Sequence, residues 1–186
     1  MAALMLVVGF IGMIQAVTIA SGMMDHARRQ TLAAQILNHE IEQLRLQSWT
    51  NINALPTAST NLGAAYSATT TYYAGDTCTR SGVWYRAIAG GSGHAPPNTS
   101  YWVVDTPPYA NVFTTSTSGV AYGATYTLAR TVADPKTNMR EITFTVTWTV
   151  ATSRRDSLGN PLTFTYRRVN TAYFGKYGLN LTYQRS

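Results

Sequence analysis

The side chains that most often carry catalysis or bind metals are few and scattered in this 186-residue chain. Its three histidines, His26, His39 and His94, lack the spacing of metal ligands, and Cys78 is the single cysteine, so no intrachain disulfide can form. The eight acidic residues form no pair suited to acid–base catalysis, and neither a Gly-x-Ser-x-Gly motif nor a Cys/His arrangement occurs. The sequence therefore predicts a protein that is not an enzyme and that uses no cofactor or metal.

The net charge of +6 does not indicate a nucleic-acid-binding protein. Adjacent arginines occur only as the isolated pairs 28–29, 154–155 and 167–168, and no nucleic-acid-binding motif surrounds them. We expect the last two pairs to be solvated and solubilising. The first pair follows an apolar run, where it would suit either the cytoplasmic flank of a membrane helix or a solvated helix face.

Aromatic rings are the second possible source of chemistry, because exposed rings can stack on the faces of sugars. Six of them gather in about 30 residues between Tyr72 and Asp105. This stretch resembles the small chitin-binding-type carbohydrate-binding modules in the order and spacing of these residues: Tyr73, Gly75, Asp76, Gly82, Tyr85, Ala87, Gly93, Pro96 and Trp102. The resemblance implies a small β-rich insert over residues 71–106.

Two functions of this insert stay open. Some members of that family carry paired tryptophans just after the position of Ala87, where this chain has Ile88 and Ala89. The remaining aromatic residues could form the core of the module, which would then be structural. If the insert binds a polysaccharide instead, the candidate sugar-binding residues are Tyr72, Trp84 and Trp102.

The elements that position these residues begin with a long apolar segment. Residues 1–24 contain no charged side chain, and as a helix they would reach roughly 36 Å, enough to cross the hydrocarbon core of a bilayer. The segment lacks the basic and cleavage regions of a signal peptide, so we expect a retained membrane helix. The residues expected to pack in a bundle of such helices are Leu6, Val7, Phe10, Ile11, Ile14 and Val17.

The helical pattern continues without a break through residues 25–49, which contain neither glycine nor proline. Here apolar residues recur at helical spacing, so this half is expected to be amphipathic. We predict one helical unit over residues 1–54, with a second half that packs on a sheet through Ile36, Leu37, Ile41 and Leu44.

Beyond Pro56 the composition changes to Thr, Ser, Tyr, Gly and Val. Residues 55–70 are small and polar, which predicts a surface linker. Three later stretches, 124–131, 140–151 and 161–172, alternate β-branched or aromatic residues with polar ones. This alternation is typical of antiparallel strands with one buried face, and it predicts a sheet domain over residues 107–186. The expected fold class is α+β: a long helix on a small antiparallel sheet, with a small β-rich insert.

Such an arrangement resembles the superfamily of type IV pilins and type II secretion pseudopilins, and above all its minor pilins. The resemblance is carried by Gly9–Ala16, by Ala33–Gln35 and Glu40–Arg45 in the helix, and by Tyr126–Val132 and Ile142–Trp148 in the sheet. It implies a structural subunit of an extracellular filament on a bacterial surface, which polymerises with copies of itself or other pilins after residence in the inner membrane. A pseudopilin of a secretion or DNA-uptake machine, and a membrane-tethered lectin that does not polymerise, are the alternatives.

The start of the chain departs from the family pattern. Mature pilins begin with a methylated Phe-like residue and carry a Glu a few positions later, which neutralises the amino terminus of a neighbouring subunit. Residues 1–4 here read Met-Ala-Ala-Leu and have neither feature. Either the recorded start is internal, which we expect, or assembly does not use that ion pair.

Overall fold

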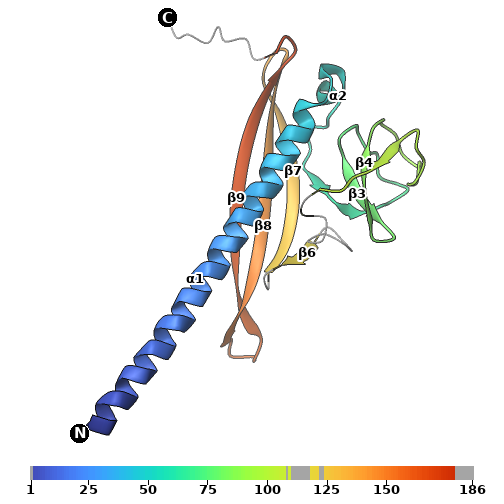
Figure 1. The fold of residues 1–186 in the computed structure, drawn as a ribbon. Helices are drawn as coiled ribbons and strands as arrows, with labels where there is room; N and C mark the ends of the chain where they lie inside the picture. The colour runs from blue at the N-terminus through green and yellow to red at the C-terminus, as the bar shows by residue number, and fades with distance from the viewer. Residues whose placement is uncertain (1, 108, 110–117, 122–123, 179–186) are drawn as a thin grey trace, which may run out of the picture.

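The computed structural model describes residues 2–107, 109, 118–121 and 124–178. Its first element is α1 (Ala2–Arg45), a single unbroken helix of 44 residues, followed by the short α2 (Trp49–Asn53), which Ser48 caps by accepting a hydrogen bond from the Asn51 backbone N–H. Residues 2–45 contain no proline, so nothing in the sequence interrupts the helical hydrogen bonds. The second half of α1 crosses one face of the main sheet, and its first half projects beyond that sheet (Figure 1).

The main sheet is antiparallel, and its strands β1 (Thr60–Leu62), β7 (Ala124–Lys136), β8 (Met139–Arg155) and β9 (Pro161–Gly175) lie side by side in that order. A further strand, β6 (Ser118–Ala121), pairs with β7. On β8, Ile142, Phe144, Val146 and Trp148 are all buried, and the intervening threonines point to the opposite face. These apolar residues join Ile36, Leu37, Ile41 and Leu44 of α1 in one core.

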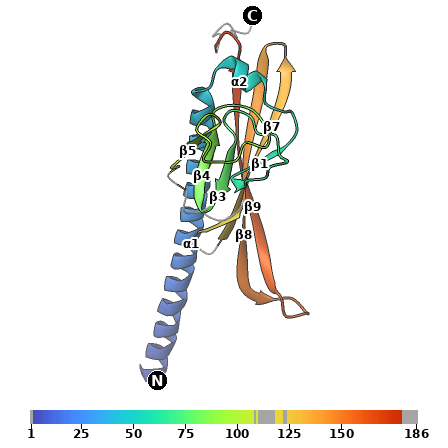
Figure 2. The same cartoon turned by 90° about the vertical axis from the view of Figure 1, so that its right-hand side faces the viewer.

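The insert forms a second, smaller sheet beside the helix, in the order β2 (Ala64–Ala65), β3 (Thr77–Arg80), β4 (Val83–Ala87) and β5 (Trp102–Val104). β2 pairs parallel with β3, and the other pairs are antiparallel. Its core consists of Tyr72, Cys78, Tyr85, Ala87 and Trp102. Seen from the side in Figure 2, the insert lies against α1 and β1, away from the end of the β8–β9 hairpin.

The predicted α+β class is confirmed, with one local difference. Residues 55–70 were expected to form a linker without strands, yet they contain β1 and β2, and Leu62 on β1 is buried. These strands are too short to show a periodicity, and they form because β7 and β3 offer them free edges. β7 itself continues to Lys136, and the chain reverses at Asn138, whose φ is 59°.

Candidate functional site

The first half of α1 exposes many large apolar side chains along its length. Phe10 and Val17 are 63% and 69% exposed, and Val7, Ile11 and Ile14 are exposed as well. Met13, Ile19, Met23 and Met24 extend the same surface toward the middle of the helix. The side chain of Leu6, predicted to pack with this group, lies outside the described residues. A contiguous apolar surface of this kind marks a site of interaction with another molecule.

The second half of the same helix is covered by the chain's own sheet. Ala33, Ile36, Leu37, Ile41 and Leu44 are each at most 5% exposed. The helix therefore changes from exposed to buried within one continuous element. Among the described residues, no helix combines the length and the apolar character needed to cross a membrane. The membrane anchor predicted for residues 1–24 stays a prediction.

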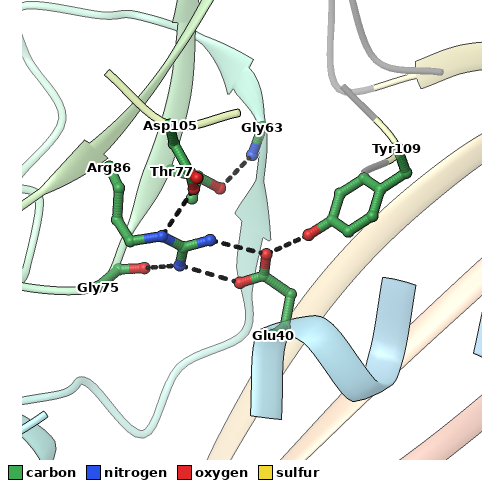
Figure 3. A network of polar contacts seen from close by, with 7 residues as sticks. All are labelled: Glu40, Gly63, Gly75, Thr77, Arg86, Asp105 and Tyr109. Atoms are coloured by element: carbon green, nitrogen blue, oxygen red, sulfur yellow. Dashed lines mark hydrogen bonds and ion pairs between the residues drawn. The ribbon is translucent and has the colours of Figure 1, made fainter. Parts of the chain in front are cut away.

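A buried polar network joins the insert to the helix (Figure 3). Arg86 on β4 donates hydrogen bonds to both carboxylate oxygens of Glu40 on α1, at 3.1 and 3.0 Å. Its Nε donates to Asp105 at 2.8 Å, and Nη1 also donates to the carbonyl of Gly75 at 3.1 Å. The hydroxyl of Tyr109 donates to the same Glu40 carboxylate. Two-point arginine–carboxylate pairs fix orientation as well as distance, so this network sets how the insert sits on α1.

The network holds Glu40 as a carboxylate. Burial alone would raise its pKa, but the charge of Arg86 and the hydrogen bonds from Arg86 and Tyr109 outweigh burial and hold the pKa below its ordinary value. Burial, together with the charge of Glu40, raises the pKa of Tyr109 well above its ordinary value, so its hydroxyl keeps its proton. The group is charged, saturated with partners and closed to solvent, which suits a structural junction better than proton transfer.

A second buried ion pair joins the insert to the main sheet. Arg130 Nη2 on β7 lies 2.7 Å from Asp76 Oδ1, and their side chains are 1% and 3% exposed. These two atoms lack the geometry of a hydrogen bond, so the attraction between them is mainly electrostatic. Asp76 also accepts a hydrogen bond from the Tyr73 backbone N–H at 2.8 Å through its other oxygen. The insert thus provides the arginine for one junction and the aspartate for the other.

Apolar packing completes the attachment of the insert. Trp84 on β4 belongs to the core of the main domain, and its ring meets that of Tyr109 edge-on at 6.2 Å. Gly63 approaches this ring so closely that a Cβ there would lie 2.2 Å from Trp84 Cη2. In Figure 3 the backbone N–H of Gly63 also points to Thr77, whose hydroxyl accepts its hydrogen bond at 3.0 Å. Together with the two ion pairs, these contacts make the insert part of the main body.

The three candidate sugar-binding residues are not on the surface, which favours the structural alternative for the insert. Tyr72, Trp84 and Trp102 are only 7%, 3% and 4% exposed. Tyr72 and Trp102 meet edge-on at 4.9 Å inside the insert, and Trp102 Nε1 donates a hydrogen bond to the His94 carbonyl at 2.5 Å. A module of this size has few other large side chains with which to fill its core, so its rings turn inward. Rings in these positions cannot lie flat on a sugar.

The four charged residues that attach the insert, Glu40, Asp76, Arg86 and Arg130, were not predicted to do so, although the sequence carries a signal for two of them. Glu40 lies three and four residues from Leu37, Ile36 and Leu44, on the buried face of α1. Arg130 follows Tyr126 and Leu128 in the alternation of inward positions on β7. A charged residue within an apolar face predicts a buried partner of opposite charge. That partner could not be named, because Arg86 and Asp76 belong to a different unit.

Other kinds of site find no support in the described part of the chain. Its histidine, cysteine, aspartate and glutamate side chains form no group of three that could hold a metal ion. Comparison with protein-family models, with curated proteins and with solved structures found no match to the chain. Function therefore has to be inferred from the exposed helix and from the body that supports it.

Proposed function

We propose that this protein is a structural subunit of an extracellular, type IV pilus-like filament, which polymerises through the first half of α1. One observation carries the proposal: a single unbroken helix is buried on its own sheet at one end and exposes apolar side chains at the other. Exposed apolar helices are stabilised when they pack together and remove that surface from water. A bundle of such helices, with the sheets and inserts outside, covers the exposed half.

The two buried ion pairs support the same function. A filament subunit carries load and repeats many times, so an insert attached at two points to helix and sheet suits it better than one on a flexible tether. A pseudopilin would share this architecture and differ in abundance. The tethered lectin is the weaker alternative, because its candidate rings are buried. Residence in the inner membrane before assembly stays a prediction. Helix bundling itself does not require such residence.

The test compares substitutions of two exposed apolar residues on the full chain. Val17→Lys places a charge in the proposed bundle, where burying an ion costs several kcal/mol. The control, Leu46→Lys, places a charge just beyond α1, at a site that is 78% exposed. We expect the Val17→Lys chain to be lost from sedimented filaments and the Leu46→Lys chain to stay in them. Both variants should keep the thermal midpoint of the native chain. Purified native filaments that hold the chain only in traces would refute a main structural role. Equal sedimentation of both variants would refute assembly through this helix.

A further inference from the structure

The face of the β8–β9 hairpin that packs on α1 is only partly covered. Trp148 is buried and stacks on Tyr166 of β9 at 5.5 Å between ring centroids. Tyr166 in turn contacts the ring of His26 on α1 at 5.1 Å, and Arg168 Nη1 donates a hydrogen bond to the Gln30 carbonyl at 3.3 Å. At this level of the hairpin, the helix of the same chain still covers the sheet.

Beyond Tyr166 the same face continues toward the hairpin tip with apolar residues. Val150 pairs across the strands with Phe164, and Leu162 lies two residues further along the same face of β9. Val150 still packs against the main core, whereas Phe164 is 57% and Leu162 42% exposed. We call Val150, Leu162 and Phe164 the hairpin patch. The patch thus extends the core outward into solvent.

The helix of the same chain cannot cover this patch. α1 is continuous from Ala2 to Arg45, with no break at which its first half could bend toward the hairpin. Figure 2 shows that the end of the β8–β9 hairpin and the first half of α1 run apart from each other. One molecule therefore exposes two apolar surfaces, the hairpin patch and the first half of α1, that do not meet within it.

From this juxtaposition we propose that the hairpin patch receives the first half of α1 from a second copy of the chain, an inference that rests on the filament function proposed above. The patch continues the very face on which a helix already packs, so a second helix would extend an existing helix-on-sheet contact. The described side chains between residues 7 and 24 carry no charge, so no buried ion would be left unpaired on the patch.

The geometry of this contact also accounts for growth into a filament. The patch and the helix are different surfaces, so each copy offers one surface to a neighbour before it and the other to a neighbour after it. Head-to-tail contacts of this kind form open helical assemblies when the rotation between copies does not close a ring. Three side chains cover far less surface than the roughly 800 Å² that each partner of a stable protein–protein pair buries. The contact therefore acts together with helix bundling.

Mixed cross-linking tests the contact. One tagged copy carries Phe10→Cys, Met13→Cys or Val17→Cys, and a differently tagged copy carries Phe164→Cys. Cys78 does not compete, because it is buried and burial raises the pKa of its thiol to about 12. We expect disulfide-linked dimers that contain both tags in sedimented filaments. The matched control is Val169→Cys, which is 43% exposed on the opposite face of the same strand and should not link.

A second comparison measures assembly directly. Phe164→Asp should lower the sedimented fraction at least tenfold and keep the thermal midpoint, whereas Val169→Asp should leave the sedimented fraction unchanged. Filaments that form normally with Phe164→Asp, or that link equally through position 169, would overturn this contact and leave the proposed function standing. If the native chain does not assemble at all, the proposed function and this contact both fall.

Discussion

Glu40 on α1 and Arg86 on β4 are 46 residues apart in sequence, yet they form a two-point ion pair that is nearly closed to solvent. The Arg86 side chain is 6% exposed and that of Glu40 is 2% exposed. Asp105 and Tyr109 complete the polar shell of this pair. The pair is therefore the main polar contact that fixes the insert on α1. This is the same helix through which we propose that the chain assembles.

Replacement of Glu40 should destabilise the folded chain. Glu40→Gln leaves the buried Arg86 with Asp105 as its remaining counter-charge, and loss of one partner of a buried pair costs about 3–5 kcal/mol. Because Asp105 stays in place, we expect the lower end, about 3 kcal/mol, in the free energy of unfolding measured with urea. Glu42→Gln is the control: its pair with Arg45 is exposed, and such pairs contribute about 0–1 kcal/mol. Equal losses of unfolding free energy in the two variants would show that the buried pair stabilises the fold no more than the exposed pair does.

The same carboxylate predicts how stability depends on pH. Since the pKa of Glu40 is lower in the folded chain than in the unfolded one, the unfolded chain binds the proton first as the pH falls. The contribution of Glu40 is therefore complete above the ordinary carboxyl pKa of about 4.3 and disappears as the pH falls through the lower, folded value. Urea midpoints between pH 7 and pH 2 should show the native chain and Glu40→Gln converging in acid. A constant difference across that range would contradict the assignment.

The close approach of Gly63 to Trp84 can be tested with two alanine substitutions. Gly63 and Gly82 have φ values of +74° and +77°, so a Cβ strains the backbone at both, by about 1–2 kcal/mol. Only at Gly63 would the Cβ also collide with the Trp84 ring, and overpacking of this kind costs about 1–3 kcal/mol more. We expect Gly63→Ala to lower the free energy of unfolding further than Gly82→Ala. If both losses are the same, Trp84 does not fill the space beside Gly63.

Cys78 reports on the core of the insert. It is fully buried and burial raises the pKa of its thiol to about 12, so a thiol reagent at pH 8 should label the native chain very slowly. Trp102→Ala removes a ring from the same core, at a cost of about 3–5 kcal/mol, and should speed labelling at least tenfold. Phe164→Ala, an exposed ring on the hairpin, should not change the rate. Fast labelling of the native chain would mean that the insert core opens readily.

Retention on chitin tests the structural role of the aromatic residues. Because Tyr72, Trp84 and Trp102 are buried, we expect no retention of the full native chain above that of an unrelated protein. Loss of retention in Trp102→Ala would by itself be ambiguous, since that change also opens the insert core. Retention of the native chain with an unchanged Cys78 labelling rate would contradict our prediction, and it would place sugar binding on another surface.

Local patterns were sufficient to predict the long helix and the three long strands of the fold. The absence of glycine and proline from residues 25–49, and the helical spacing of Leu37, Ile41 and Leu44, predicted the second half of α1. The alternation of apolar residues and threonine over residues 142–150 predicted β8 and its buried face. Both depend on interactions between residues a few positions apart, and such interactions are visible in one sequence.

Tertiary packing alone decided the partners of those elements. From the sequence, the aromatic residues of the insert could face sugar or core. Trp84 is buried with Leu62 and Tyr109 in the main core, whereas Tyr72 and Trp102 are buried in the core of the insert. The pairing of Glu40 with Arg86, and of Asp76 with Arg130, likewise depended on how three separate units meet. A charged residue on an apolar face requires a partner, but its identity is set by distance in space, which one sequence does not encode locally. The sequence by itself thus determined the long helix, the three long strands and the periodicity of their faces, while the tertiary structure decided which of these faces are buried within the chain and which stay exposed.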